Sequence, residues 1–226
     1  MSQLKKFGSK PSLIIFDCDG VLVDSEPIAN RILVEALGGA GYPITLDDAV
    51  ARFVGRSMAA VVEMVEADLG RPLPDGFVAA FQARTFAAFE RDLTAMPGVA
   101  EVLAELDVAV CVASSGSPDK IAHSLSLTGL DRFFDGNLFS AAMVARGKPA
   151  PDLFLYAAKE MKVDPGCCLV IEDSVPGVEA ARAAGMVVLG FVGGGHADAA
   201  LGGRLRLAGA TVFSDMADLD RMIAEA

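Results

Sequence analysis

Residues 13–26 read LIIFDCDGVLVDSE. Its first four residues, Leu13–Phe16, form a short continuous apolar run, which is typical of a strand buried on both faces of a sheet. Asp17, Asp19 and Gly20 follow at once, so the strand is expected to end in two acidic side chains and a turn. Open parallel sheets bind their ligands at this end of their strands. The stretch therefore predicts an α/β fold with a polar site after its first strand.

Short apolar runs of the same kind recur along the chain, and most are followed by a helical pattern. The expected strands are Leu13–Phe16, Val108–Ala113, Asn137–Phe139, Leu169–Ile171, Val187–Phe191 and Ala210–Phe213. The expected helices are Val99–Leu106, Asp119–Thr128, Asp152–Met161, Val178–Ala184 and Asp215–Ala226. Buried strands that alternate with helices indicate a doubly wound parallel sheet with both faces covered.

One segment interrupts this alternation, because more than ninety residues separate the first two expected strands. Four helices are expected within it: Pro27–Leu37, Leu46–Phe53, Met58–Leu69 and Asp75–Glu90. In the first of them, Ile28, Ile32, Leu33 and Leu37 fall on one face, as they do in an amphipathic helix. We therefore expect residues 25–92 to form an inserted all-helical cap, and residues 1–24 with 93–226 to form the α/β catalytic core.

Composition narrows the class of protein. The chain has 226 residues, 53% of them hydrophobic, and a formal net charge of −11, which predicts a folded core and argues against nucleic acid or anionic membranes as partners. The four cysteines lie in or beside apolar runs without metal-ligand spacing, so they are interpreted as buried side chains in a reducing compartment. The N-terminal residues lack the apolar core of a signal peptide, and no apolar run has the length of a membrane span, so a cytoplasmic location is expected.

Three of the expected strands end in polar residues of catalytic type. Asp17 and Asp19 follow the first, Ser114 and Ser115 the second, and Glu172-Asp173 the run Leu169–Ile171. Aspartate and serine are also common turn residues, which is a sufficient account of any single pair. Because parallel strands end at one edge of a sheet, all three groups together predict one shared site.

The charges expected in this site require a counterion. Four carboxylates in one small space repel each other and a phosphate, whereas Mg²⁺ binds carboxylates together with water and phosphate oxygens. Lys148, in a loop stiffened by Pro149 and Pro151, offers a fixed positive charge, although a lysine at the surface is the alternative. Four carboxylates, one Mg²⁺ and one lysine leave a formal charge of −1, or zero if Asp19 is protonated.

Four motifs follow one another in order: FDCDGVLVDSE at 16–26, VASSG at 112–116, GKPAPD at 147–152 and IEDSVPGVEAARAAGM at 171–186. Together they closely resemble the four motifs of the haloacid dehalogenase-like (HAD) hydrolase superfamily. The early helical insert resembles the β-phosphoglucomutase/phosphatase-type branch of that superfamily. The resemblance implies a Rossmann-like core with a helical cap between the first two motifs.

The resemblance also implies roles for these residues. Asp17 matches the nucleophile that forms an aspartyl-phosphate, and Asp19 matches the general acid and base, whose backbone carbonyl also binds the metal. The metal set implied for Mg²⁺ is Asp17, Asp19, Glu172 and Asp173. The phosphate-binding set implied is Ser114, Ser115 and Lys148.

The expected cap suggests where specificity lies. It contains no lysine between Asp24 and Asp92, so a Schiff-base lysine of the phosphonatase type is absent. Arg56 matches a cap loop that faces the substrate in similar enzymes, with an exposed arginine at a helix start as the alternative. The two histidines, His123 and His196, are interpreted as surface or packing residues, and Gly193–Gly195 as a flexible loop.

The function that these features predict is a Mg²⁺-dependent phosphatase, a phosphoric monoester hydrolase acting on a sugar phosphate or a phosphorylated sugar acid. Two alternatives stay open: a phosphomutase of the β-phosphoglucomutase type, and a catalytically silent binding protein on the same fold. In the mutases that the chain resembles, a histidine after the first motif gates the general acid. Ala29 holds that position here, which favours hydrolysis.

Overall fold

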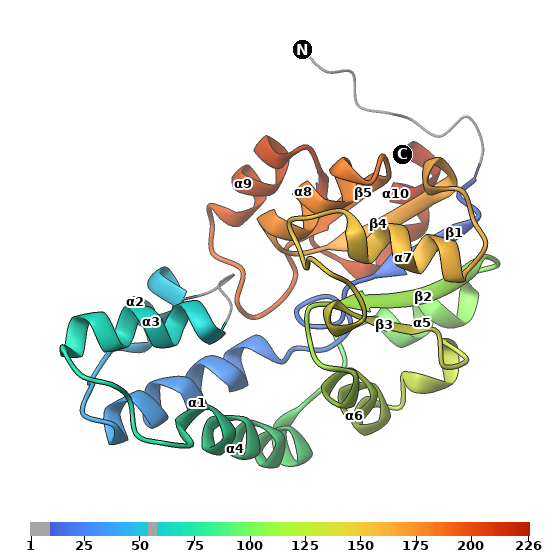
Figure 1. Ribbon diagram of the computed structural model, residues 1–226. Coiled ribbons are helices and arrows are strands. Elements are labelled where there is room, and N and C mark those ends of the chain that lie inside the picture. The colour runs from blue at the N-terminus through green and yellow to red at the C-terminus, as the bar shows by residue number, and fades with distance from the viewer. Residues whose placement is uncertain (1–9, 54–57) are drawn as a thin grey trace. The chain divides into compact units, whose positions relative to one another are not determined.

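The computed structural model describes residues 10–53 and 58–226 (Figure 1). The described chain forms two compact units. Ser25–Leu93 make one, and the segments up to Asp24 and from Thr94 to Ala226 make the other. The unit Ser25–Leu93 is thus inserted into the larger unit between Asp24 and Thr94.

The larger unit contains one sheet of parallel strands in the order β3-β2-β1-β4-β5-β6. The strands are β1 (Leu13–Phe16), β2 (Ala109–Ser114), β3 (Leu138–Ser140), β4 (Cys168–Glu172), β5 (Val187–Phe191) and β6 (Thr211–Phe213). The predicted parallel sheet is confirmed. Strands β2, β3 and β4 each end one residue later than expected, so Ser114, Ser140 and Glu172 are their last residues.

Helices flank this sheet on either side of the strands (Figure 1). They are α5 (Val99–Glu105), α6 (Pro118–Thr128), α7 (Asp152–Glu160), α8 (Val175–Ala183), α9 (Leu201–Ala208) and α10 (Leu219–Glu225). Helix α8 begins three residues before the expected start, because the Ser174 hydroxyl caps it by accepting a hydrogen bond from the Gly177 amide at 3.1 Å. Helix α9 was not expected, since Gly202 and Gly203 lower the helix propensity of its first turn.

Alternate side chains of each strand pack on opposite faces of the sheet. Leu13 and Ile15 of β1 join a buried cluster with Leu153 of α7 and Leu205 of α9. Ile14 and Phe16 point to the other face and are equally buried. Both faces are therefore covered, which explains why β1 reads as a continuous apolar run rather than an alternating one.

The inserted unit is helical and has its own core. Its helices are α1 (Glu26–Gly39), α2 (Leu46–Phe53), α3 (Met58–Leu69) and α4 (Phe77–Asp92). The face predicted on α1 is confirmed, because Ile28, Ile32, Leu33 and Leu37 are all buried in this core. Residues 54–57, between α2 and α3, lie outside the described chain.

The two connections to the inserted unit leave the larger unit side by side. Val23 and Ala95 form an antiparallel bridge, and the Asp24 amide donates to the Thr94 carbonyl at 3.0 Å. The Met96 amide donates to the Leu22 carbonyl at 2.9 Å. The outgoing and returning segments are therefore hydrogen-bonded to each other before the insertion begins.

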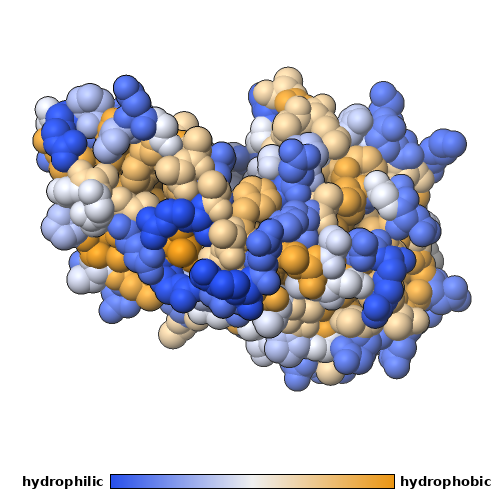
Figure 2. Space-filling model, turned by 90° about the horizontal axis from the view of Figure 1, so that it is seen from below, coloured by the Kyte–Doolittle hydropathy of each residue, from blue (hydrophilic) through white to orange (hydrophobic). Residues whose placement is uncertain are grey.

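Hydrophilic and hydrophobic side chains are interspersed over the face drawn in Figure 2. Large hydrophobic side chains that are exposed lie on separate elements, for example Leu46 on α2, Leu155 on α7 and Leu207 on α9. Cys18, Cys111 and Cys168 are buried, but the expectation of burial is wrong for Cys167, which is exposed in the turn before β4. Across residues 10–53 and 58–226, no helix is both long and apolar enough to cross a membrane.

Candidate active site

The order in which the chain adds strands to the sheet reverses between β1 and β4. From β1 the chain adds β2 and β3 on one side, and from β4 it adds β5 and β6 on the other. The Asp17 amide, just after β1, donates to the Ile171 carbonyl of β4 at 2.9 Å. This bond places Asp17 level with Glu172, at the switch point where open parallel sheets bind ligands.

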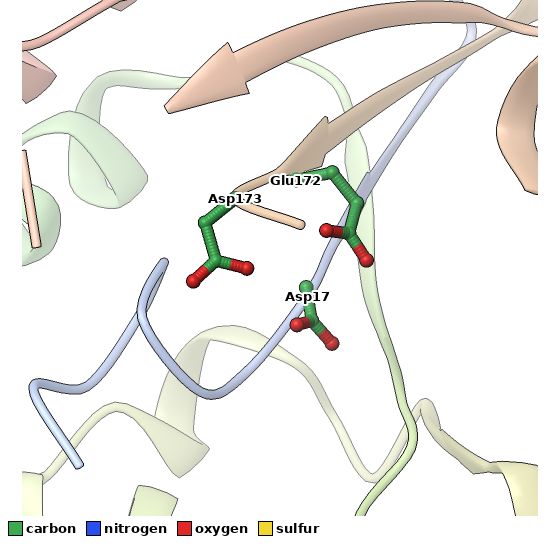
Figure 3. A group of neighbouring side chains, drawn as sticks. All are labelled: Asp17, Glu172 and Asp173. Carbon is green, nitrogen blue, oxygen red and sulfur yellow. The ribbon is translucent and has the colours of Figure 1, made fainter. Parts of the chain in front are cut away.

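Three acidic side chains meet at this point. Asp17, Glu172 and Asp173 each place one carboxylate oxygen so that all three atoms lie within 4.8 Å of one another, and all three residues are buried. Figure 3 shows the three carboxylates directed toward one another from the ends of β1 and β4. Hard divalent cations prefer oxygen ligands of this kind.

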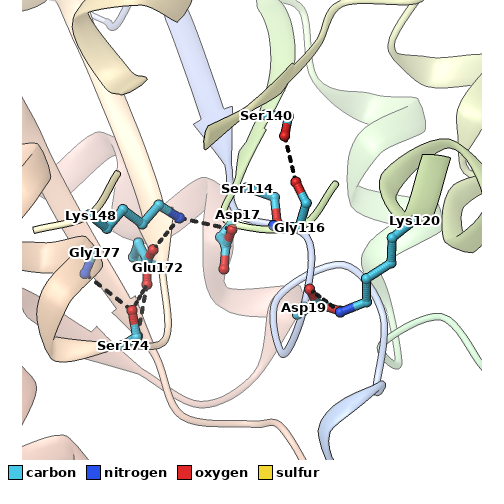
Figure 4. Close-up of polar contacts among 10 residues, drawn as sticks. All are labelled: Asp17, Asp19, Ser114, Gly116, Lys120, Ser140, Lys148, Glu172, Ser174 and Gly177. Atoms are coloured by element: carbon cyan, nitrogen blue, oxygen red, sulfur yellow. Dashed lines mark hydrogen bonds and ion pairs between the residues drawn. The ribbon is translucent and has the colours of Figure 1, made fainter. Parts of the chain in front are cut away.

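Lys148 lies against this acidic cluster. Its Nζ is 2.9 Å from Asp17 Oδ1 and 2.6 Å from Glu172 Oε1, and its side chain is only 5% exposed (Figure 4). Burial lowers the pKa of Lys148, but the attraction of Asp17 and Glu172 outweighs it, so the pKa lies above its ordinary value and the ammonium stays charged. The alternative of a solvated surface lysine is therefore wrong.

The charge of Lys148 does not neutralise the cluster. Burial raises the pKa of Asp17, Lys148 lowers it, and Glu172 and Asp173 raise it again, with a net result well above the ordinary value of 3.8. Three buried carboxylates thus share one ammonium, and a divalent cation among them would favour their ionised forms. The residues present therefore fit such a cation.

Glu172 is fixed by the start of α8. Its Oε2 accepts hydrogen bonds from the Ser174 amide at 2.7 Å and from the Ser174 hydroxyl at 2.8 Å, and it has no exposed surface. Gly177 leaves room for this carboxylate, because a Cβ there would lie 1.7 Å from Glu172 Oε1. The first turn of α8 thus forms a socket for one acidic side chain.

Asp19 has a partner that the sequence did not suggest. Lys120, in the first turn of α6, places its Nζ 2.7 Å from Asp19 Oδ2 (Figure 4). Four carboxylates and the two lysines, Lys120 and Lys148, leave a formal charge of −2. With Asp19 ionised, one divalent cation brings that total to zero, in place of the −1 expected with Lys148 alone.

The two serines predicted to bind phosphate differ in their surroundings. Ser114, at the end of β2, is buried, and its hydroxyl accepts a hydrogen bond from the Gly116 amide at 3.1 Å. The Ser140 hydroxyl at the end of β3 donates to the Gly116 carbonyl at 2.6 Å and so holds the same loop (Figure 4). Ser115 is exposed.

Of the two roles expected for His196, surface or packing, the surface role is excluded by its burial. Its side chain is buried, and its Nε2 lies 3.0 Å from Asp173 Oδ2. Arg56, the predicted specificity residue, lies outside the described residues, so its role stays a prediction. Among the described residues, Lys120 and His196 are charged or titratable side chains at this site that the sequence analysis did not place there.

Comparison with known proteins places this geometry in a family. The model of the haloacid dehalogenase-like hydrolases matches residues 11–185. A 6-phosphogluconate phosphatase of Escherichia coli is 31% identical over 189 residues, which cover 83% of this chain and 86% of that enzyme.

Two solved structures are similar over nearly their whole length. A haloacid dehalogenase-like protein of unknown function from Agrobacterium tumefaciens has a TM-score of 0.85 and 39% identity, covering 94% of this chain and 97% of the other. A HAD family hydrolase from Deinococcus radiodurans, with bound phosphate and sodium, has a TM-score of 0.79 and 31% identity, covering 95% and 96%.

Proposed function

The chain belongs to the haloacid dehalogenase-like hydrolase family, and on that premise we propose that it is a Mg²⁺-dependent phosphatase acting through Asp17. The proposed substrate is a small phosphorylated metabolite, either a sugar phosphate or a phosphorylated sugar acid. The name of the Escherichia coli relative, a 6-phosphogluconate phosphatase, supports this substrate class.

One observation carries the proposal: Lys148 contacts both Asp17 and Glu172 inside a buried acidic cluster. A nucleophilic carboxylate must approach a phosphate dianion, and the like charges repel each other unless cations lie between or beside them. The ammonium of Lys148 is held within 2.9 Å of the proposed nucleophile, where it offsets part of this repulsion.

The remaining charge calls for a second cation, and Mg²⁺ is the one we propose. Asp17, Glu172 and Asp173 would hold it, together with the backbone carbonyl of Asp19. Bound there, Mg²⁺ supplies positive charge to the phosphate oxygens during transfer. The raised pKa of Asp17 supports this assignment, because the ionised nucleophile needs more positive charge than Lys148 provides.

The proposed reaction has two steps. In the first, an Asp17 oxygen attacks phosphorus, the ester P–O bond breaks, and Asp19 gives its proton to the departing oxygen. In the second, Asp19 takes a proton from water, the water oxygen attacks phosphorus, and the bond between phosphorus and Asp17 breaks. Asp17 is regenerated, Asp19 is protonated again, and inorganic phosphate is the product.

The other side chains have supporting roles in this scheme. Ser114 and Ser115, at the end of β2, are proposed to bind phosphate oxygens together with Lys148. The helical unit Ser25–Leu93 is proposed to act as the cap that selects the substrate, with Arg56 as a contributor. Specificity in this scheme depends on the helical unit, and the chemistry depends on the α/β unit.

A phosphate-release screen tests the proposal. The purified protein is incubated with a panel of sugar phosphates, phosphorylated sugar acids and an aryl phosphate, with Mg²⁺ present, and inorganic phosphate is measured. Asp17→Asn serves as the matched control, because it keeps the size of the side chain and removes the nucleophilic oxygen. We expect wild-type turnover on at least one metabolite and a loss of several orders of magnitude in the variant, since covalent catalysis is deleted. Equal phosphate release by a folded Asp17→Asn protein would overturn the mechanism.

A further inference from the structure

The loop between β5 and α9 brings His196 to the acidic cluster. The side chain of His196 is 6% exposed, and its Nε2 lies 3.0 Å from Asp173 Oδ2. The two side chains are therefore in direct polar contact, which is an ion pair when the imidazole is protonated. The histidine comes from a segment outside the four sequence motifs.

Hydrogen bonds hold the loop that carries this histidine. The Gly195 amide donates to Asp24 Oδ1 at 3.1 Å, and the Ala197 amide donates to the Gly194 carbonyl at 3.0 Å. On the strand side, the Val192 amide donates to the Phe213 carbonyl of β6 at 2.9 Å. The predicted loop Gly193–Gly195 therefore has backbone hydrogen bonds on both sides of His196.

Two glycines pack closely around the His196–Asp173 pair. Gly20, with φ of +76°, passes so near that a Cβ there would lie 1.9 Å from Asp173 Oδ2 and 2.8 Å from His196 Cε1. A Cβ on Gly194 would lie 2.8 Å from His196 Cε1 and Nδ1. The backbone segments at Gly20 and Gly194 thus leave the imidazole and the carboxylate little freedom to turn.

We propose that His196 is a positioning residue that fixes the orientation of Asp173, so that this carboxylate is already set to bind the divalent cation. The inference rests on the proposed metal-dependent function. Carboxylates that bind metals are commonly held by hydrogen bonds from a surrounding shell of residues, and losing such a partner weakens metal binding. His196 supplies a close polar contact to Asp173 from the β5–α9 loop, and Ser174 supplies hydrogen bonds to Glu172 from the start of α8.

The test compares metal affinity among four proteins by isothermal titration calorimetry with Mg²⁺ and with Mn²⁺. His196→Ala removes the donor, and His196→Gln places an amide NH₂ near the position of Nε2. His123→Ala is the matched control, since it removes the other histidine of the chain. We expect His196→Ala to weaken metal binding by about 10–100-fold, as for the loss of other outer-shell partners. His196→Gln should recover most of the affinity, and His123→Ala should equal the wild type.

Kinetics separate positioning from a general loss of structure. Raising the Mg²⁺ concentration should restore kcat in His196→Ala, and its melting temperature in chelator should stay near that of the wild type. Nitrogen-15 spectra of the imidazoles, assigned with His123→Ala, should show hydrogen on Nε2 of His196. Hydrogen found on Nδ1 alone would contradict the contact directly, without any metal.

Two failures are distinguishable. If the wild type binds neither cation, the proposed metal-dependent function fails and the inference falls with it. If the wild type binds metal and folded His196→Ala binds it equally well, only the inference about His196 is overturned. His196→Gln remaining as weak as His196→Ala, with both proteins folded, would also overturn it, because a donor at that position would then make no difference.

Discussion

Lys120 and Asp19 are 101 positions apart in the chain, yet Lys120 Nζ lies 2.7 Å from Asp19 Oδ2. Asp19 occupies the turn after β1, and Lys120 lies in the first turn of α6. The pair therefore joins the proposed general acid to a helix that follows the adjacent strand, β2. The four motifs contain no cation expected to contact Asp19, whereas the structure places the Lys120 ammonium against it.

Replacing Lys120 by methionine should lower turnover while leaving the fold intact. The variant keeps the length of the side chain but loses the ammonium that holds Asp19, so Asp19 meets the leaving oxygen in the correct orientation less often. General acid–base catalysis contributes about 10²–10⁴-fold, and we expect a partial loss of about tenfold in kcat. Lys159→Met, at an exposed position of α7, is the control and should leave kcat unchanged. An unaltered kcat in Lys120→Met would show that the pair has no part in turnover.

Asp17→Asn should raise the stability of the metal-free protein at neutral pH. The pKa of Asp17 in the folded state lies above its ordinary value of 3.8, chiefly because of burial. Between these two pKa values the folded state binds more protons than the unfolded state, so its stability falls as the pH rises. Asparagine carries no charge and escapes this loss.

The measurement is the melting temperature in chelator at several pH values. Each kcal/mol gained should raise it by about 2–4 °C for a protein of this size. The advantage of Asp17→Asn should shrink as the pH is lowered through the folded-state pKa of Asp17. A variant that melts below the wild type at neutral pH would show that the buried charge does not destabilise the metal-free fold.

Chelation should abolish phosphate release, and added Mg²⁺ should restore it. The acidic cluster keeps an excess of negative charge that Lys148 and Lys120 do not cancel. Metal bound to the folded state also stabilises it, by about 2.7 kcal/mol at one hundred times the dissociation constant. Melting temperatures with and without Mg²⁺ therefore provide a second readout. Full activity after exhaustive dialysis against chelator would remove the metal from the proposed function.

Gly177→Ala should damage the site, whereas Gly203→Ala should not. A Cβ at Gly177 would overlap the Glu172 carboxylate, so the variant must move Glu172 or the first turn of α8. Overpacking of this kind costs about 1–3 kcal/mol. Gly203, in α9, has nothing within 4 Å of its would-be Cβ, and alanine there should stabilise the helix by about 0.5–1 kcal/mol. Denaturant unfolding and Mg²⁺ affinity measure both effects; a Gly177→Ala protein with normal stability and affinity would contradict the socket described for Glu172.

The last prediction distinguishes a phosphatase from a phosphomutase, which transfers the phosphoryl group back to the sugar. Ala29 lies on α1, and its methyl group donates no hydrogen bond. The resemblance to β-phosphoglucomutases implies that a gating histidine would stand at this position in a mutase. We therefore expect β-glucose 1-phosphate, if it is accepted, to yield inorganic phosphate rather than glucose 6-phosphate. Following both products decides the matter. Accumulation of glucose 6-phosphate at a catalytic rate, with negligible phosphate release, would favour the mutase.

The parallel sheet and the acidic residues at its switch point were predictable because the signals are local. Asp17 and Glu172 come at the ends of buried apolar runs, and parallel strands must end at the same edge. The hydrolase class was also predictable, because the motifs keep their order along the chain. These features depend on residues that are close together in the sequence, so the amino-acid sequence is enough to predict them.

Lys120, His196 and α9 were not predictable from the same patterns. Lys120 lies on an amphipathic helix among other polar residues, and only the packing of α6 brings it to Asp19. His196 lies in a glycine-rich loop without periodicity, and its contact with Asp173 depends on how that loop folds back. Glycines in the first turn of α9 lower the helix propensity of its sequence, and the packing of Leu201 and Leu205 stabilises the helix. Each of these depends on contacts between elements that are distant in sequence.

The paired connections at Val23–Ala95 and Asp24–Thr94 make the helical insertion exchangeable in evolution. The 69 residues Ser25–Leu93 connect two segments that are already hydrogen-bonded to each other, as the loop of a β-hairpin connects its two strands. A lineage can therefore lengthen, shorten or replace the helices without changing the register of β1 and β2. Under the proposed function, a change in the helical insertion would alter substrate choice while Asp17 and the other residues of the α/β unit stay as they are.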